Sequence, residues 1–353
     1  MLSNKNKVVI ASAGSRKTTF IVEAALAILE RKCLITTYTN ENIDQINSYL
    51  IEKKGYVPPN ITVASWYSFL LQDGVRPYQN HMTDKGRIRS IDFTNTPNQF
   101  AKKADVDRYY LTSGDNIYRD RVACFICESD KHTHGLIVQR LEKIYSHIFI
   151  DEIQDFAGYD LDFLEKLFNS SISIVCVGDP RQATFSTNNS SKNKKYKKSE
   201  ILEWVNSKMK ANLLHVEKRN ECYRSNQLIC DFADALFPSL PKSISKNDKA
   251  TGHDGVYFVN ENEALDYYKT HGPTVLRYNK KTDTMGLPAA NIGTMKGRTF
   301  ERVLIFPTKP MKEYLKTKDI SKAGDISKLY VAVTRAKYSA AFVVGSWYND
   351  CNS

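Results

Sequence analysis

The most constraining feature of the sequence is a strand, a small-residue turn and a helix that follow one another near its start. Residues 8–10 (VVI) are β-branched, and residues 18–30 carry apolar side chains at helical spacing. The turn between them reads ASAGSRKT. Backbone N–H groups in such a turn, at a helix N-terminus, can cradle phosphate. The residues expected to contact a phosphate-bearing ligand are Ala11, Ser12, Ala13, Gly14, Ser15, Arg16, Lys17, Thr18 and Thr19.

Two side chains would supply the chemistry of this loop. Lys17 is expected to reach the β- and γ-phosphates, and the Thr18 hydroxyl to ligate Mg²⁺. The loop departs from the usual pattern at Arg16, where a glycine normally lets the backbone approach phosphate. Arg16 can point away from the nucleotide, add a cation beside it or obstruct binding. Taken alone, the segment is equally consistent with an ordinary turn between a strand and a helix.

A second signal follows the apolar run at residues 147–150, which ends in Asp151 and Glu152. A nucleoside triphosphatase needs one acid to hold Mg²⁺ and another to orient the attacking water, and these carboxylates fit those roles in that order. Acidic residues after a strand are common in loops, so this signal is also ambiguous by itself. Together, the two signals predict a nucleoside triphosphatase that uses ATP and Mg²⁺.

Further short apolar runs alternate with helical stretches, which predicts a parallel α/β sheet. A Ser/Asn/Lys-rich segment at 186–199 reads as an exposed loop, and residues 200–210 read as a helix. A second α/β unit is expected to begin at residues 213–216, with the domain boundary near residue 215. The expected strands lie at 33–37, 61–64, 148–150 and 172–177 in the first unit, and at 255–259, 274–276, 303–306 and 340–344 in the second.

Charge and composition narrow the class of protein. Lys and Arg total 50 against 39 Asp and Glu, a net charge of +11, which favours a polyanionic partner without separating nucleic acid from other polyanions. Seven scattered cysteines favour a reducing cytoplasm over a disulfide framework. No apolar run approaches the ~18–20 residues that span a bilayer, so no membrane partner is expected.

Nine segments, in order, resemble the motifs of superfamily 1 helicases of the UvrD/Rep (PcrA-like) type. The first is the phosphate loop; the others, motifs Ia, Ib, II, III, IV, IVa, V and VI, lie at 35–40, 64–69, 151–155, 177–182, 222–225, 276–279, 293–297 and 331–336. The resemblance implies an α/β fold of two RecA-like P-loop NTPase domains with parallel sheets. Residues 1–215 would form the first, with a small insertion at about 71–146, and residues 216–353 the second, with a short insertion. The chain would be a compact form with reduced accessory subdomains.

The same resemblance implies roles for individual residues. Gln182 would sense the γ-phosphate, Arg224 and Arg335 would stabilise charge on the transferring phosphoryl group, and Tyr223 would stack on the base. The implied catalytic residues are Lys17, Asp151, Glu152, Gln182, Arg224 and Arg335; the nucleotide would also contact Tyr223 and Gly297, and Mg²⁺ would be held by Thr18 and Asp151.

Nucleic acid would be bound by motif residues and by a lysine-rich loop. Aromatic faces suit this role because stacking tolerates any base. Trp66 and Tyr67, taken singly, are equally consistent with core aromatic residues, and a lysine run is often only a solvated surface. The implied contacts are Thr39, Trp66, Tyr67, Phe185, Lys194, Lys195, Thr294 and Lys296.

These features predict an ATP-dependent DNA helicase or translocase, moving 3′–5′ by analogy on single-stranded DNA or on a duplex with a single-stranded tail. By the same analogy it would work with a nuclease partner in DNA repair or antiviral (anti-phage) defence. The alternative is a nucleotide-regulated DNA-binding subunit of a larger complex with little ATP turnover, which Arg16 favours. An RNA-directed motor stays open, because nothing in the sequence reports on the 2′-OH.

A zinc site at Cys124, Cys127, His132 and His134 is the one metal alternative. The ligand types suit zinc, but the second pair is crowded and the surroundings are apolar and helical. Two buried thiols and two exposed histidines are therefore favoured.

Overall fold

The computed structural model describes residues 5–345 and residue 348. The chain divides into two compact units. Unit 1 comprises Met1–Ile10, Lys17–Pro180 and Phe185–Glu217, and unit 2 comprises Ala11–Arg16, Arg181–Thr184 and Lys218–Ser353. Two short segments that directly follow strands of unit 1 are therefore grouped with unit 2.

Unit 1 is built on a six-stranded sheet in the order β3-β2-β6-β7-β1-β8. Each pair from β3 to β1 is parallel, as strands joined by helical crossovers must be. Every side chain of β2 is buried, which is typical of a strand covered on both faces. The strands are β1 (Lys7–Ala11), β2 (Cys33–Thr37), β3 (Ile61–Ser65), β6 (His147–Ile150), β7 (Ser173–Gly178) and β8 (His215–Arg219).

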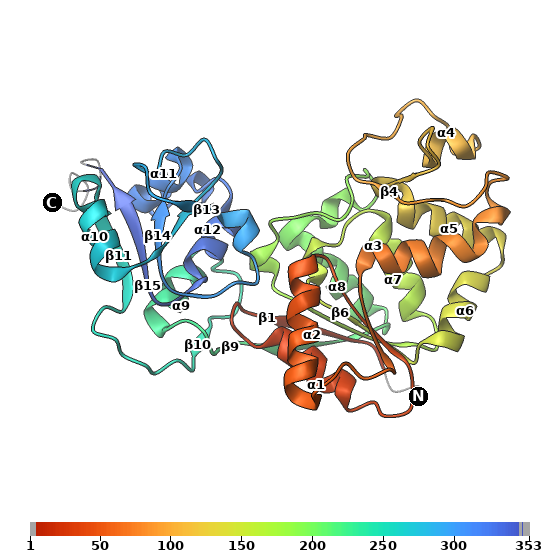
Figure 1. Cartoon of the computed structure of the whole chain (residues 1–353), viewed down its shortest axis with the longest axis horizontal. Helices are drawn as coiled ribbons and strands as arrows, with labels where there is room; N and C mark the ends of the chain where they lie inside the picture. The colour runs from red at the N-terminus through yellow and green to blue at the C-terminus, as the bar shows by residue number, and fades with distance from the viewer. Residues whose placement is uncertain (1–4, 346–347, 349–353) are drawn as a thin grey trace. The chain divides into compact units, whose positions relative to one another are not determined.

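Helices contact this sheet and each other (Figure 1). The N-cap of α2 is Thr39, which accepts a hydrogen bond from the Asn42 amide, and its C-cap is the left-handed Gly55. The helices are α1 (Lys17–Leu26), α2 (Asn40–Lys54), α3 (Trp66–Phe69), α5 (Val122–His132), α6 (Leu136–Ile144), α7 (Tyr159–Phe168) and α8 (Ile201–Lys210).

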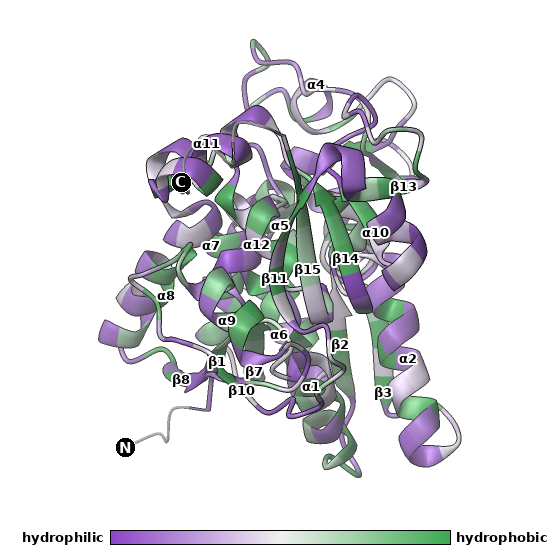
Figure 2. Ribbon diagram, turned by 90° about the vertical axis from the view of Figure 1, so that its left-hand side faces the viewer, coloured by the Kyte–Doolittle hydropathy of each residue, from purple (hydrophilic) through white to green (hydrophobic). Residues whose placement is uncertain are grey.

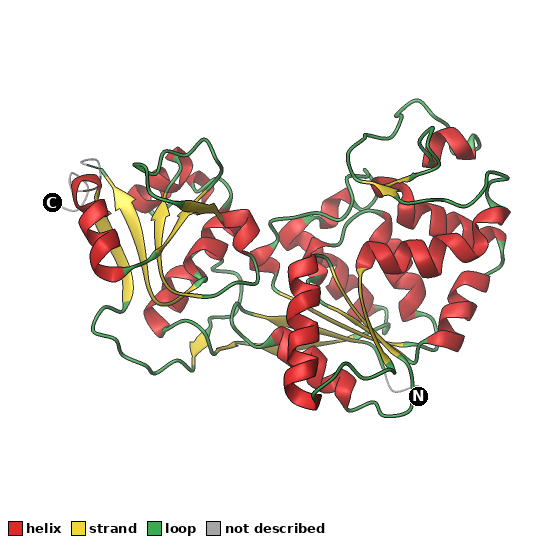
Figure 3. Ribbon diagram, in the orientation of Figure 1, coloured by secondary structure: helices red, strands yellow, loops and turns green. Residues whose placement is uncertain are grey.

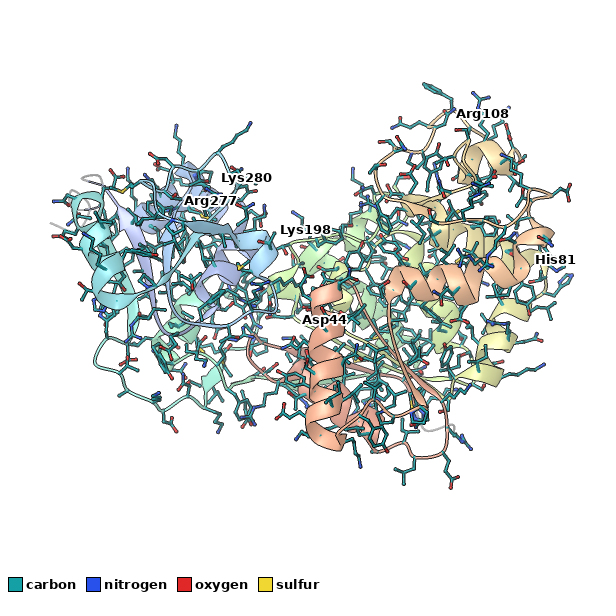
Figure 4. All side chains as sticks on the ribbon, viewed as in Figure 1. Asp44, His81, Arg108, Lys198, Arg277 and Lys280 are labelled. Carbon is teal, nitrogen blue, oxygen red and sulfur yellow. The ribbon has the colours of Figure 1, made fainter. Side chains whose placement is uncertain are left out.

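Within the expected insertion, α5 and α6 form the later part, whereas residues 82–118 contain little regular structure. A π-helical turn (η1, Leu70–Val75) and a 3-10 helix (η2, Arg76–His81) continue α3, and the short α4 (Val106–Tyr110) follows. A two-residue parallel pair joins β4 (Ile91–Asp92) to β5 (Ile117–Tyr118). Loops make up most of residues 82–118 in Figure 3, and Figure 4 labels Arg108 among them and His81 at the end of η2.

Unit 2 has a five-stranded sheet in the order β11-β15-β14-β12-β13, parallel throughout. Its core strands are apolar, and much of β14 is coloured hydrophobic in Figure 2. The strands are β11 (Gly255–Asn260), β12 (Thr274–Arg277), β13 (Ala289–Asn291), β14 (Phe300–Phe306) and β15 (Ala336–Val344). The helices are α9 (Gln227–Asp234), α10 (Ala264–His271), α11 (Lys309–Thr317) and α12 (Ile326–Val333), and a small pair joins β9 (Glu221–Cys222) to β10 (Ile244–Ser245).

The α/β fold class with parallel sheets is confirmed, and all the strands predicted at 8–10, 33–37, 61–64, 148–150, 172–177 and in the second unit are present. Three expectations were wrong. The first helix ends at Leu26 instead of residue 30. Just after its end, the Asn60 side-chain amide donates a hydrogen bond to the Ile28 carbonyl. The segment at 213–216 leads into β8, which lies next to β1 in the first sheet instead of beginning a second one.

The third error concerns the loop at 186–199, which is not uniformly exposed. Thr187 and Asn188 are buried, because they fill hydrogen-bond positions inside unit 1. Lys198, labelled in Figure 4, is exposed.

Among residues 5–345 and 348, no helix combines the length and the apolar character that crossing a bilayer requires.

Candidate nucleotide site and aromatic groove

Thr18 and Asp151 meet at the carboxyl end of β6. The Thr18 hydroxyl donates to a carboxylate oxygen of Asp151 at 3.1 Å, and Asp151 is held in place by its backbone N–H, which bonds the Thr36 carbonyl on β2. A hydroxyl and a carboxylate are the hard oxygen ligands that Mg²⁺ prefers. The donor set present in unit 1 therefore fits the expected ion.

The electrostatics of Asp151 also suit a cation. Burial, followed by the neighbouring charge of Glu152, raises the pKa of the Asp151 carboxyl to about 7, and the Lys17 ammonium acts in the opposite direction. Two adjacent carboxylates out of water repel each other unless positive charge is near. A divalent cation would relieve that repulsion and keep Asp151 ionised.

Glu152 is held in an unusual backbone conformation. Its φ and ψ are 63° and 44°, in the left-handed region that few residues other than glycine adopt. The Gln154 side chain donates to the Glu152 carboxylate and accepts from the Asp179 backbone N–H at 3.0 Å. Strained residues persist where the surroundings fix them, and such positions cluster at functional sites. Gln154, which sequence reasoning did not single out as a site residue, is thus the side chain that orients Glu152.

The first six loop residues are grouped with unit 2. The Ala13 amide donates to the Tyr330 hydroxyl, and the Gly14 carbonyl accepts from the Tyr223 amide at 2.9 Å. Gly14 has φ +74°, and a Cβ there would lie 2.7 Å from the Arg224 Cβ, so only glycine fits. The Ser15 hydroxyl is buried and has no hydrogen-bond partner among the described residues, which leaves a donor that a phosphate oxygen would satisfy.

The structure shows where the Arg16 side chain lies, which the sequence left open. Its φ is 60°, so it keeps the left-handed conformation that a glycine would adopt. Its guanidinium carbon lies 3.9 Å from the centroid of the Tyr223 ring, a cation–π contact. Tyr223 is 38% exposed, and its hydroxyl donates to Glu221. The Arg16 side chain is therefore directed onto Tyr223.

Gln182, Arg224 and Arg335 are close together within unit 2. Arg335 donates to the Gln182 side-chain oxygen at 3.1 Å, and Arg224 donates to the carbonyl of Thr334, the residue before Arg335. Arg335 is 1% exposed, so it is a buried side chain and not a surface residue. Among the other predicted nucleotide contacts, Gly297 has a left-handed backbone with φ 85°. Lys17 and Thr19 lie in the first turn of α1, in unit 1.

An open groove of about 530 Å³ lies in unit 1, and we call it the aromatic groove. Three predicted nucleic-acid residues line it: Thr39, Tyr67 and Phe185. The rings of Tyr67 and Phe185 are linked through the ring of Tyr38, whose centroid is 4.6 Å from that of Phe185 and 5.3 Å from that of Tyr67. The complete lining is Tyr38, Thr39, Asn40, Ser65, Tyr67, Ser68, Leu71, Ser90, Ile91, Phe93, Arg119 and Phe185.

Sequence reasoning missed nine of the twelve lining residues, and those among the nine with aromatic or charged side chains are Tyr38, Phe93 and Arg119. Tyr38 is adjacent to Thr39 in motif Ia, so the motif itself contained that signal. Phe93, 55% exposed with its ring 5.0 Å from that of Tyr67, and Arg119 come from the insertion. No local pattern places either of them beside residues 38 and 67.

Other predicted nucleic-acid residues lie outside the groove. Trp66 is 1% exposed and its indole N–H donates to Asp160, so the expectation that it stacks on a base is wrong: it is a core residue. Lys194 and Lys195 are exposed but do not line the groove. In unit 2, Thr294 is exposed and Lys296 half-buried.

The four zinc-ligand candidates do not form a site. Cys124 is buried, Cys127 is half-buried, and His132 and His134 are exposed. Within residues 5–345 and 348 no group of three or more His, Cys, Asp or Glu side chains could hold a metal ion.

Two family profiles match the sequence. The profile described as the viral superfamily 1 RNA helicase core domain matches residues 126–344, and the profile described as an AAA domain matches residues 1–188. The first covers more than half of the chain. The chain belongs to the viral superfamily 1 RNA helicase core family. A superfamily 1 helicase core is thus confirmed, while the UvrD/Rep type stays a prediction.

One solved structure with a TM-score above 0.5 agrees with this helicase core at the level of the fold. The helicase nonstructural protein 10 of an arterivirus in complex with DNA is 16% identical, with a TM-score of 0.51, over 97% of this chain and 62% of that one. A crystal structure of an arterivirus nonstructural protein 10 (helicase) gives 15% identity and a TM-score of 0.49 over 97% and 60%. The helicase core thus spans about three fifths of these chains. No curated protein matches the sequence.

Proposed function

We propose that this helicase core is an ATPase, stimulated by nucleic acid, that moves along single-stranded DNA. The contact that carries the proposal is the one between Thr18 and Asp151, beside Glu152, because it assembles a metal-binding pair next to a carboxylate held for chemistry. The left-handed backbone at Glu152 supports the proposal, because strained positions cluster at functional sites.

In the proposed mechanism, Lys17 binds the β- and γ-phosphates, and Thr18 with Asp151 holds Mg²⁺. Bound Mg²⁺ would neutralise charge on the phosphate oxygens. Glu152, aligned by Gln154, orients and deprotonates the attacking water. Positive charge for the transferring phosphoryl group comes from Arg224 and Arg335, and Gln182 reaches the γ-phosphate.

The aromatic groove is the proposed site for the bases of the strand. Two exposed rings line it, that of Phe185, 43% accessible, and that of Phe93, 55% accessible, and stacking on such a ring contributes ~1–3 kcal/mol per base. We expect Phe185→Ala to weaken binding of an oligothymidylate by about fivefold or more. Phe100→Ala is the matched control, since Phe100 is 92% exposed but does not line the groove. Equal affinities of the two variants, measured by fluorescence anisotropy, would show that the bases do not bind in the groove.

The choice of DNA, the 3′–5′ direction and a nuclease partner in repair or anti-phage defence are the finer parts of the proposal, and they rest on resemblance to the UvrD/Rep type. RNA is the second candidate substrate, because the matching family profile describes an RNA helicase core. Translocation assays on DNA and RNA strands labelled at either end would decide both substrate and direction.

The decisive experiment is ATP hydrolysis with and without single-stranded DNA, duplex DNA and RNA. We expect multiple turnover that single strands increase and that Glu152→Gln abolishes while ATP still binds. Glu203→Gln, the same change on an exposed acid of α8, should behave as the wild type. Turnover that is negligible with every nucleic acid would instead identify the alternative, a nucleotide-regulated DNA-binding subunit.

A further inference from the structure

A chain of hydroxyl groups leads out of the aromatic groove into the interior of unit 1. The Tyr38 hydroxyl donates to the Tyr67 hydroxyl at 2.7 Å, and the Tyr67 hydroxyl donates to the Thr187 carbonyl at 2.6 Å. Tyr67 lines the groove yet is only 6% exposed, and Thr187 is fully buried. The chain therefore connects a ring of the groove with a residue that no strand can touch.

Thr187 is in turn bonded to the segment that follows the acidic pair. Its amide donates to the Asp155 carbonyl at 2.8 Å, and its hydroxyl accepts from the Ala157 amide at 2.9 Å. The next turn is also fixed from α3, because the indole N–H of the core residue Trp66 donates to the buried Asp160. Thr187 thus bonds the Asp155 carbonyl and the Ala157 amide, and Trp66 bonds the Asp160 carboxylate. Tyr67 is connected to this segment through its bond to Thr187.

Only one turn of 3-10 helix (η4, Ile153–Asp155) separates this segment from Glu152. The Asp155 amide donates to the Glu152 carbonyl at 3.0 Å, and Gln154, in the middle of the turn, holds the Glu152 carboxylate. Closely packed, fully bonded turns move as units because interiors have little free volume. A displacement of Thr187 would consequently shift both the backbone and the carboxylate of Glu152.

The two tyrosines keep their protons in this environment. Burial is the main cause that raises the pKa of Tyr67 and that of Tyr38 well above their ordinary values. Each hydroxyl can therefore donate at neutral pH, and the direction of donation runs from the groove towards Thr187.

We propose that Tyr67 and Thr187 are positioning residues that transmit occupancy of the aromatic groove to Glu152. A base stacked on Phe185 would displace the Tyr38 ring packed against it, and the hydroxyl chain would carry that shift to Thr187 and on to η4. This inference rests on the proposed function, since it assumes a nucleic-acid strand in the groove. It adds a route by which the strand stimulates hydrolysis.

The first test compares hydroxyl deletions with a matched control. Tyr67→Phe keeps the ring and removes the donor, and Thr187→Val removes the hydroxyl that accepts from Ala157. Tyr145→Phe is the control, because Tyr145 is also 6% exposed and donates to a distant partner, Asp73. The measured quantity is the ratio of kcat with a saturating oligothymidylate to kcat without it, using about 20 nucleotides so that the ~4–16 covered by one site are exceeded.

We expect this ratio to fall at least about fivefold for Tyr67→Phe and Thr187→Val, which is the effect of losing one buried hydrogen bond. The double variant should fall no further than either single variant, since both break one chain. Oligonucleotide affinity of Tyr67→Phe should change by less than about threefold, because the ring remains. Unchanged ratios, or a ratio that falls only because affinity is lost, would overturn the proposal, as would an equal fall in Tyr145→Phe.

A second measurement needs no turnover and separates this inference from the proposed function. Hydrogen exchange of the Thr187 and Ala157 amides should slow or accelerate when oligothymidylate binds the wild type, and should not respond in Tyr67→Phe. If wild type shows that response but never hydrolyses ATP, the proposed function fails and the connection stands. If hydrolysis is stimulated while these amides do not respond, the connection fails and the function stands.

Discussion

At the scale of single residues, three positions in the predicted phosphate loop and acidic motif share a left-handed backbone. Gly14 adopts it without penalty, whereas Arg16 and Glu152 do so at a cost of ~1–2 kcal/mol each. Arg16 offsets part of that cost by its contact with Tyr223, and Glu152 by its hydrogen bond from Gln154. Position 16 therefore carries arginine where the usual phosphate loop has glycine, but its backbone keeps the conformation that glycine would adopt.

Gly14→Ala should destabilise the protein by about 2 kcal/mol or more, because φ +74° strains alanine and the added Cβ meets Arg224. Urea denaturation followed by circular dichroism measures the change. Gly293→Ala is the control, since a Cβ there meets nothing within 4 Å and its backbone is not left-handed. Equal midpoints for the two variants would contradict the close approach at Gly14.

The raised pKa of Asp151 predicts an unusual pH dependence in the absence of metal. The folded-state pKa of about 7 exceeds the ordinary 3.8, so the folded protein binds more protons between these values. The contribution of Asp151 to stability should therefore be greatest at low pH and fall as pH rises from about 4 to 7. Asp151→Asn should make the metal-free protein more stable than wild type at pH 8 by over ~1 kcal/mol. Chemical denaturation with EDTA tests this, and added Mg²⁺ should reverse the order of the two proteins.

At the scale of elements, the short α3 shows how one motif divides between two tasks. Consecutive helix residues point in different directions, so Trp66 faces the core while Tyr67 reaches the groove. The Trp66 ring packs against Phe156, with centroids 4.6 Å apart, and bonds Asp160. Motif Ib therefore supports the segment after the acidic pair with one residue and lines the groove with the next.

Trp66→Phe should destabilise the fold by about 2–3 kcal/mol, because it leaves a cavity and removes the donor to buried Asp160. Affinity for oligothymidylate, measured where the variant is folded, should remain that of wild type. A large loss of affinity without loss of stability would restore Trp66 as a base-stacking residue.

At the scale of the whole molecule, the net charge of +11 suits a polyanionic strand, and the exposed Lys194 and Lys195 are predicted to contribute. On a single strand, each neutralised phosphate changes the log–log slope of affinity against salt by about −0.7. Replacing both lysines by alanine should therefore make the slope less negative by about 1.4. Binding titrations over a range of NaCl concentrations measure it, with Lys280→Ala, an exposed lysine outside the predicted contacts, as the control. An unchanged slope would exclude the two lysines from the strand path.

Much of this architecture could be predicted from local sequence. Hydrophobic periodicity and β-branched runs located nine of the eleven strands of the two main sheets, because a buried strand must be apolar along its own length; β13 was missed and β8 was assigned to the wrong unit. The acidic pair after residues 147–150 predicted the partner of Thr18, since the carboxyl ends of parallel strands meet at one edge of a sheet.

Only the tertiary structure decided which aromatic residue is core and which is exposed, where the Arg16 side chain lies, and that residues 38, 93, 119 and 185 share one groove. These depend on partners far away in the chain, as Tyr67 and Thr187 are 120 residues apart. Local pattern carries no record of such partners, because the energy of a buried contact arises only when the chain brings both sides together.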